Sequence, residues 1–505
     1  MRARARWVVA AVAALAAAGI CRSYQPARAE LAMDNQHYFY IAERAASGRP
    51  PHVSQIDSKS QLGPLIAAAA IAVARPLGGD DVIAARTMGM ATVLVSVAVA
   101  ALLAFDLGGG VAGAVLTAGL LFLVRGLFVE GATGVRPQVY VVFFVLLAHF
   151  ADRHRRPALA GAAAACSFLC WQPTLLVLAA LAAAALARPQ PFAWLVRLAV
   201  GALVPVVVYE SYFVWHGAAG AQLFQELVLP TYSVHRGLDL AESFGFVLSD
   251  ATAIARGGIH TLPAVALAAM ALGWAWLALR PRRTLAKLRE RPAWLALLLA
   301  GNGALVFTLY DHQAHPDLLF VQPYFAVGVG AAAGGLAQRL MRGRSDWVLV
   351  AAATAVALLG LRHAVATGHA RGPGLGTLED QRALAAQLDL TRRRYGSVWA
   401  CGPVHLLGLL HQDNFSPYGF LYDDLLASGL LDGFRPLRGA AMPDLIVLSR
   451  NRVPANFGWV RQEYQPVTPP AFRAAHITML ARKGATPAGR TGGRGPQNPA
   501  PAGGR

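Results

Sequence analysis

Apolar runs long enough to cross a membrane recur along most of this 505-residue chain. Hydrophobic residues make up 56% of the sequence and charged residues only 14%, and the mean hydropathy is +0.44. A soluble globular protein of this size would not normally show such a composition. Because hydrocarbon offers no water to unpaired backbone groups, the runs predict an all-α polytopic membrane bundle of about eleven transmembrane helices. The predicted spans are 7–21, 84–105, 111–128, 138–151, 157–171, 173–187, 195–213, 260–279, 293–310, 319–338 and 346–362.

Positive charge predicts the orientation of this bundle. The net charge is +18, but much of the excess arginine lies in short loops between spans, where it indicates orientation and not nucleic-acid binding. A cytoplasmic amino terminus puts the arginine clusters within 2–6, 153–156, 280–291 and 339–344 on the inner side. We therefore expect a multi-pass protein of a bacterial inner membrane. An alternative interpretation of the first segment is a cleavable secretory signal that ends at Ala29.

The chain divides into three predicted parts. Residues 1–362 form the membrane domain, and 22–83 are its first periplasmic loop. An odd number of spans places residues 363–484 outside, where a capped helix over 377–394 and short apolar runs predict a small periplasmic α/β domain. The tail 485–505 is Gly, Pro and Arg without apolar content, so it should be disordered. The predicted strands lie at 397–401, 445–448 and 477–480.

The first external loop concentrates the polar residues that a reaction would need. Asp34 opens a helix-like segment with an aromatic face, and Asp57 and Lys59 stand two residues apart. The apolar segment 61–77 is short for a crossing, so we expect a helix lying at the outer membrane interface. The pattern also includes Gly48, Pro50 and Pro51 after the first helix, Pro64 and Leu65 at the start of the second, Gly78 and Gly79 after it, and Ala-Ala-Arg at 84–86.

This order and spacing resemble the C-type (GT-C) fold glycosyltransferases that use polyprenyl-phosphate sugars. The family includes protein mannosyltransferases and the aminoarabinose transferase of lipid A. The specific likeness covers residues 34–86, and a looser one covers 1–362. It implies a membrane enzyme that moves a sugar from a polyprenyl-phosphate carrier to a periplasmic glycan, lipid or protein acceptor, by an inverting single displacement. Two positions depart from the pattern, since many members have Glu where Asn35 stands and Lys where Gln172 stands.

The chemistry of such a transfer assigns roles to five residues. The acceptor hydroxyl must lose its proton as it attacks the anomeric carbon, and a carboxylate is a suitable base. Asp34 is the predicted base, and Asp57 is the second catalytic candidate. The departing phosphate gains charge and needs fixed cations, which Lys59, Arg86 and Arg136 can supply. The ordinary alternatives are a helix cap for Asp34, an ion pair with Lys59 for Asp57, and headgroup contacts for the cations.

The remaining candidates would position the substrate or hold a metal. Substrate positioning is predicted for His37, Tyr38 and Asp317. No cofactor is expected, with a divalent metal as the alternative, because an outer loop has suitable ligand types that are also common in plain polar turns. The metal candidates are Asp311, His312 and His315.

Two other functions remain open at this stage. A polytopic transporter or flippase for a lipid-linked or small polar substrate fits the composition, but transporters carry ionisable residues deep within spans. Here the ionisable residues cluster at one face. A non-catalytic scaffold whose outer domain binds cell-wall polymer also fits, although it would not need the pattern from Asp34 to Lys59.

Overall fold

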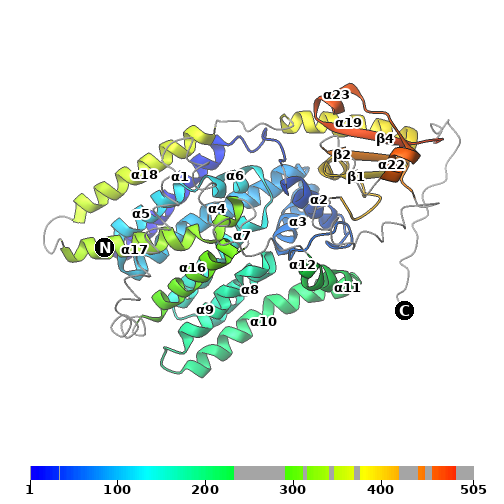
Figure 1. Cartoon of the computed structure of the whole chain (residues 1–505). Coiled ribbons are helices and arrows are strands. Elements are labelled where there is room, and N and C mark those ends of the chain that lie inside the picture. The colour runs from blue at the N-terminus through cyan, green and yellow to red at the C-terminus, as the bar shows by residue number, and fades with distance from the viewer. Residues whose placement is uncertain are drawn as a thin grey trace.

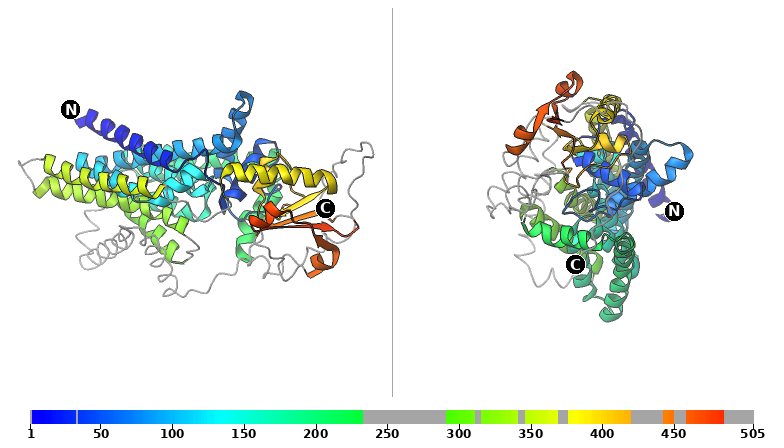
Figure 2. Two further views of the ribbon diagram at one scale, coloured as in Figure 1. Left: turned by 90° about the horizontal axis from the view of Figure 1, so that it is seen from above. Right: turned by 90° about the vertical axis from the view of Figure 1, so that its right-hand side faces the viewer.

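A long bundle of helices makes up most of the molecule, and a small sheet lies at one end of it (Figures 1 and 2). We call this end the sheet end and the opposite one, where the chain begins, the far end. The structure is a computed structural model that describes residues 2–32, 34–232, 291–310, 315–340, 346–368, 376–419, 442–449 and 458–484.

Apolar helices form the body of the bundle. Alanine-rich and leucine-rich faces pack against one another in a single large core that includes residues of α1, α4, α7 and α17. The helices are α1 (Arg2–Ser23), α4 (Asp81–Ala104), α5 (Gly110–Phe122), α6 (Arg125–Thr133), α7 (Pro137–Arg153), α8 (Pro157–Cys170), α9 (Leu175–Ala185), α10 (Pro191–Trp215), α16 (Pro292–Tyr310), α17 (Gln322–Leu340) and α18 (Asp346–Gly368).

Within the described residues, four helical stretches are long and apolar enough to cross a membrane. They are Arg4–Ser23, Asp81–Phe122, Pro191–Trp215 and Pro292–Tyr310. The pair α6 and α7 passes the same test together but is bent by 119° at its break. Several apolar helices are therefore present, as predicted. The count of about eleven stays a prediction, since the proposed span 260–279 lies outside the described residues.

Two predicted spans differ from the structure in detail. The spans 84–105 and 111–128 correspond to α4 and α5, which pack against each other, and the π-helical turn η2 (Phe105–Gly109) joins them in place of a loop. Gly108 in this turn has φ of 110°, a conformation that favours glycine. The second span ends early, because α5 stops at Phe122 and a new helix starts at Arg125. A charged residue at that position closes the apolar run.

The first loop folds into two short helices at the sheet end. They are α2 (Asp34–Ala46) and α3 (Leu62–Ala74), and the short turn η1 (Arg75–Leu77) follows α3. One side of α3 is buried, while Val73 and Leu77 nearby are largely exposed although apolar. These surfaces agree with a helix lying along a membrane interface.

A four-stranded mixed sheet forms after α18, with strand order β1-β2-β4-β3. The strands are β1 (Val398–Cys401), β2 (Leu445–Ser449), β3 (Tyr464–Pro466) and β4 (Ile477–Arg482); β1 and β2 are parallel and the other pairs antiparallel. Strands β1, β2 and β4 coincide with the apolar runs that the sequence predicts as strands. Strand β3 was missed because it is a three-residue edge strand that ends in proline.

Short helices accompany the sheet and the loops of the bundle. Helix α19 (Leu378–Tyr395) opens with the capping box of Thr377 and Asp380, as the sequence predicts. The others are η3 (Gln172–Thr174), α11 (Ala219–Leu223), η4 (Phe224–Val228), α12 (Leu229–Tyr232), η6 (His315–Phe320), α20 (His405–Leu409), α22 (Gly458–Glu463) and α23 (Pro470–Ala474).

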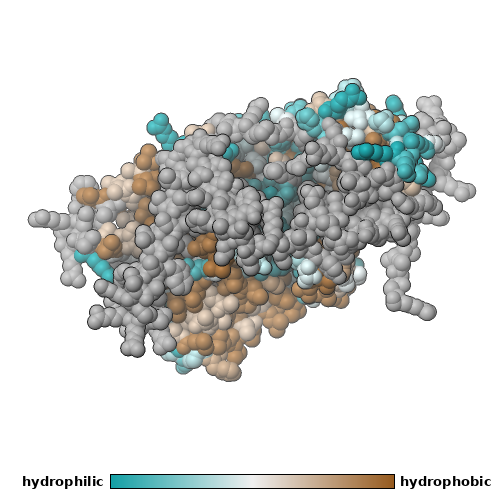
Figure 3. All heavy atoms as spheres, viewed as in Figure 1, coloured by the Kyte–Doolittle hydropathy of each residue, from teal (hydrophilic) through white to brown (hydrophobic). Residues whose placement is uncertain are grey.

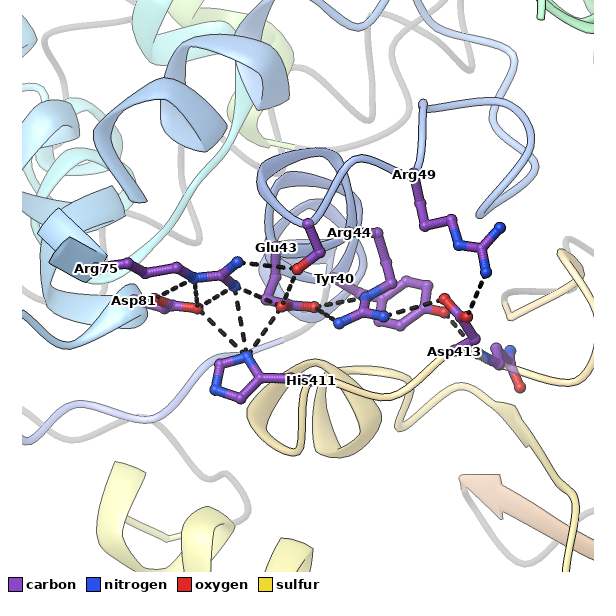
Figure 4. A network of polar contacts seen from close by, with 10 residues as sticks. Tyr40, Glu43, Arg44, Arg49, Arg75, Asp81, His411 and Asp413 are labelled. Atoms are coloured by element: carbon purple, nitrogen blue, oxygen red, sulfur yellow. Dashed lines mark hydrogen bonds and ion pairs between the residues drawn. The ribbon is translucent and has the colours of Figure 1, made fainter. Parts of the chain in front are cut away.

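A charged network joins the carboxy-terminal part to the first loop (Figure 4). Glu43 of α2 is fully buried and accepts hydrogen bonds of 2.6 Å from both Arg44 and Arg75. His411 approaches the same carboxylate at 3.0 Å, and Arg44 also donates to Asp413 at 3.0 Å. The buried carboxylate thus has partners from three parts of the chain, and the charges of the two arginines offset the cost of its desolvation.

Neutral contacts extend this interface. The Tyr40 hydroxyl accepts from the backbone N–H of Asn414 at 2.7 Å. The side chain of Gln381 in α19 pairs with both backbone groups of Leu31, at 2.9 Å each. The segment before α2 and the sheet region are therefore held to each other by buried hydrogen bonds.

The network makes a prediction about stability. Arg44→Met removes a buried cation between two carboxylates and should lower the free energy of unfolding by about 3 kcal/mol. Arg49→Gln is the matched control, because Arg49 binds the same Asp413 at 3.3 Å but is half exposed. Arg49→Gln should lower the free energy of unfolding by less than about 1 kcal/mol. Thermal unfolding of the purified proteins in detergent measures both, and equal losses would refute a structural role for the buried pair.

Candidate functional site

An ion pair joins the start of α2 to the turn between α6 and α7. Arg136 donates from Nη2 to Oδ2 of Asp34 at 2.8 Å, and its Nε lies 3.5 Å from Oε2 of Glu130. Arg136 is buried, whereas the Asp34 side chain is 39% exposed. The arginine therefore orients a carboxylate that solvent or a substrate can still reach.

Asn35 fixes the same turn through its amide group. It donates to Glu130 at 2.9 Å and accepts from the backbone N–H of Val135 at 2.8 Å. A Cβ atom on Gly134 would lie 2.3 Å from the Asn35 amide oxygen, so this approach requires glycine. Asn35, where many members of the resembled family have Glu, therefore has a structural role, because its side chain binds the turn that carries Arg136.

The second predicted carboxylate, Asp57, is almost completely buried in the loop between α2 and α3. It accepts from the Gln61 side chain and from the backbone N–H of Lys59, each at 3.0 Å, and lies 3.4 Å from Nε2 of His37. Burial raises the pKa of Asp57, but the hydrogen bond and charge of His37, the charge of Lys59 and the Gln61 hydrogen bond lower it to about 2. Asp57 is therefore ionised at neutral pH.

A buried polar cluster that the sequence analysis missed supports this loop. Glu226 accepts from Tyr209 at 2.5 Å and from Ser60 at 3.1 Å, and lies 3.0 Å from Nε2 of His52. Gln225 accepts from the backbone N–H of Asp57 at 3.1 Å. These partners are far apart in the chain, so no local spacing could reveal them. The one available signal was a Gln-Glu pair within the short segment that follows the apolar helix α10.

Several predicted site residues act electrostatically on Tyr38. It is buried on α2, and its pKa is raised well above the usual value, first by burial and then by the charges of Asp57, Asp34 and Asp317, which Arg136 partly offsets. The charges of these four groups therefore all influence the Tyr38 hydroxyl. Asp317 comes from the buried turn η6, so the site joins distant parts of the chain.

The turn between α8 and α9 also reaches the site. Gln172 donates to the backbone carbonyl of Ser58 at 2.8 Å. The half-buried Lys59 follows directly, and its carbonyl accepts from Gln61 at 2.6 Å. Gln172 therefore holds the backbone beside Lys59 through a neutral hydrogen bond.

Arg86 has a different place from the one expected for a phosphate ligand. It is fully buried in α4 and donates to four backbone carbonyls, those of Thr133 at 2.9 Å, Pro26 at 2.6 Å, Ala29 at 2.8 Å and Glu30 at 2.9 Å. These bonds hold the segment before α2 against α4 and α6. With its donors used in this way, Arg86 is a structural residue and is left out of the phosphate site.

The metal candidates are mostly outside the described residues. This applies to Asp311, His312 and the side chain of His315. Within the described part, one group of ligand atoms lies close enough to hold an ion, namely Glu43, Asp81 and His411, within 4.8 Å of one another.

Arg75 already occupies the space between the two carboxylates of that group. Its guanidinium donates to Glu43 and to Asp81 at 2.6 Å each (Figure 4). It also lies 3.4 Å from Nδ1 of His411. An ion would have to displace this arginine, so the group is better described as part of the network that joins α2 to the carboxy-terminal part.

Comparison with known proteins identifies the fold. No protein-family model and no curated protein sequence matches this chain. Among solved structures, ArnT from Cupriavidus metallidurans bound to undecaprenyl phosphate is 14% identical, with a TM-score of 0.53 over 97% of this chain and 99% of that one. The Archaeoglobus fulgidus oligosaccharyltransferase in complex with zinc and sulfate is 12% identical, with a TM-score of 0.53 over 87% and 68% of the two chains.

A third match has the same fold. Archaeal oligosaccharyltransferase AglB from Archaeoglobus fulgidus, in complex with an inhibitory peptide and a dolichol-phosphate, is 11% identical, with a TM-score of 0.50 over 88% of this chain and 69% of that one. The C-type glycosyltransferase fold predicted from the first loop is therefore confirmed as the fold of this chain.

Proposed function

We propose that this protein is a membrane glycosyltransferase that moves a sugar from a polyprenyl-phosphate carrier to an acceptor at the outer face of a bacterial inner membrane. The observation that carries the proposal is the partly exposed carboxylate of Asp34, held by the buried Arg136 at the sheet end of a bundle of apolar helices. The shared fold supports it, since the similar structures include proteins bound to undecaprenyl phosphate and to a dolichol-phosphate.

Asp34 is the proposed base. One of its oxygens is held by Arg136, and its partial exposure leaves it accessible to an acceptor hydroxyl. That hydroxyl attacks the anomeric carbon, its proton passes to Asp34, and the bond between the sugar and the phosphate breaks. The attack and the departure occur on opposite faces of the sugar, so the configuration inverts. The phosphate leaves with its own charge, so no proton donor or cofactor is needed.

Lys59 is the proposed partner of the departing phosphate, and Arg136 is the second proposed cation. Asp57 is a poor base at neutral pH because its pKa is about 2. We assign it instead to holding Lys59 and His37 in place. His37, Tyr38 and Asp317 remain proposed substrate-positioning residues; the acceptor is a glycan, a lipid or a protein.

The alternative function is a transporter or flippase for a lipid-linked substrate, and a product assay separates the two. The purified protein is reconstituted in vesicles that contain polyprenyl-phosphate sugars extracted from a strain lacking the gene, together with envelope extract as the acceptor source. A transferase releases free polyprenyl phosphate and consumes the lipid-linked sugar. Movement of the intact lipid across the vesicle membrane without release would refute the transferase proposal.

Asp34→Asn should lower the release of polyprenyl phosphate by about 10² to 10⁴ fold, the usual contribution of a positioned base. The fold should survive, since Arg136 keeps Glu130 as a partner. Asp413→Asn is the control, because Asp413 is also a partly exposed carboxylate held by arginine but lies outside the site. Turnover of the Asp34 variant within a few fold of the control would exclude it as the base.

Lys59→Ala should weaken binding of undecaprenyl phosphate, and Lys59→Arg should restore part of it, since Arg keeps the charge but presents it in another geometry. Binding to the purified protein is followed by native mass spectrometry. Lys483→Ala serves as the control, because Lys483 lies at the end of β4 and donates to the backbone of Gln462. If both Lys59 variants bind like the parent, Lys59 is only an interfacial anchor.

Orientation gives a further prediction. Single cysteines at Arg49, which is exposed at the sheet end, and at Arg156, which is exposed at the far end, are placed in a variant without the four native cysteines. A membrane-impermeant thiol reagent should label position 49 and spare position 156 in intact cells whose outer membrane has been permeabilised. Labelling of both in broken cells is the control. The reverse pattern would place the site in the cytoplasm and contradict the proposal.

A further inference from the structure

A cavity of about 370 Å³ lies at the far end of the bundle. Its wall includes Arg153, Arg155, Arg188 and Arg291, together with the helix break at Asp106. The volume is within the range of roughly 300–1,000 Å³ that is typical of small-ligand sites. Such a density of arginine points to an anionic ligand.

The cavity lies at the opposite end of α7 from the candidate site. That helix begins after Arg136 and ends at Arg153, so its 17 residues separate the two places by about 25 Å. The cavity can therefore be studied without altering the proposed catalytic residues.

The acidic group in the cavity wall is already engaged. Asp106 lies 2.9 Å from His154 and 3.4 Å from Arg6, and its backbone carbonyl accepts from Arg153 at 2.8 Å. Asp106 therefore leaves little negative charge to oppose an incoming anion.

Arg188 is held in place from two sides. It binds Asp152 with hydrogen bonds of 2.6 and 2.7 Å and stacks on Trp194, with 3.9 Å between the guanidinium carbon and the ring centre. Its charge is largely compensated. Arg188 is thus a rigid part of the cavity wall, and the excess positive charge of the cavity comes from other arginines.

Arg155 and Arg291 supply that excess charge. Both are exposed, and neither has an acidic partner among the residues that the structure describes. Arg155 also adopts φ of 57°, a left-handed conformation that costs energy for any residue other than glycine. Arg153 has no carboxylate partner within the described part of the chain either, but its guanidinium binds the Asp106 carbonyl, so Arg155 and Arg291 are the cations best placed to bind one anionic group.

The surroundings of the cavity are apolar. Leu186 and Phe192, on either side of Arg188 in the chain, are largely exposed. Figure 3 shows a mainly hydrophobic surface over α9 and α10, which lead to this end. A basic cavity beside exposed apolar side chains at the end of membrane helices is the arrangement that receives a lipid headgroup and its acyl chains.

We infer that this cavity binds the phosphodiester headgroup of an anionic phospholipid, with Arg155 and Arg291 as its main ligands. This inference does not depend on the proposed transferase activity. The phosphate chemistry is shared with free phosphate, and the apolar surroundings favour the lipid.

The full-length protein is purified, delipidated and titrated with phosphatidylglycerol or phosphatidylcholine, with bound lipid counted by native mass spectrometry. The parent should prefer phosphatidylglycerol. The double variant Arg155→Gln with Arg291→Gln should bind it more weakly by about five-fold for each arginine removed. Arg156→Gln is the matched control, since Arg156 is the exposed neighbour that does not line the cavity. It should bind like the parent.

Several outcomes would overturn the inference. The double variant could keep the parent's affinity while unfolding at the same temperature, or the control could lose as much affinity as the double variant. Complete displacement of phosphatidylglycerol by an equal concentration of inorganic phosphate would show a site for the free anion. Retention of the lipid under that competition supports the headgroup site.

Discussion

The hydrogen bonds of Arg86 are the interaction on which the geometry of the candidate site depends. A buried guanidinium is costly unless its donors are satisfied, and here four backbone carbonyls satisfy them. Three of these carbonyls belong to residues 26–30, which precede Asp34, and the fourth belongs to Thr133, which precedes Arg136. One side chain of α4 therefore places both partners of the ion pair, although it touches neither of them.

Local patterns predicted the helices well and their ends less well. The apolar runs predicted most described helices of the bundle, and the capping residue Thr377 and its partner Asp380 predicted the start of α19. The break at Gly108 lies between the predicted spans 84–105 and 111–128. The early end of α5 before Arg125 was not predicted, since the apolar residues on both sides of Arg125 suggest one continuous run. Strand β3 was not predicted, because three residues are too few to show the alternating hydrophobic pattern of a strand.

The candidate site was predictable where its residues are close in sequence. The spacing of Asp57 and Lys59 indicated a pair, and the structure joins them through the backbone N–H of Lys59. The role of Arg86 could not be predicted, because a sequence shows a cation but not the carbonyls that it meets. The contact of His52 with Glu226 spans the helices between them, so only the folded chain shows it.

The two carboxylates of the first loop have different surroundings, and these divide their roles. Asp57 is buried among donors that hold its pKa at about 2, so it keeps its negative charge. This charge can hold His37 and Lys59 in position. Asp34 accepts a hydrogen bond from Arg136 and remains partly exposed. A general base must both meet its substrate and accept a proton, and of the two carboxylates Asp34 has the access that this requires.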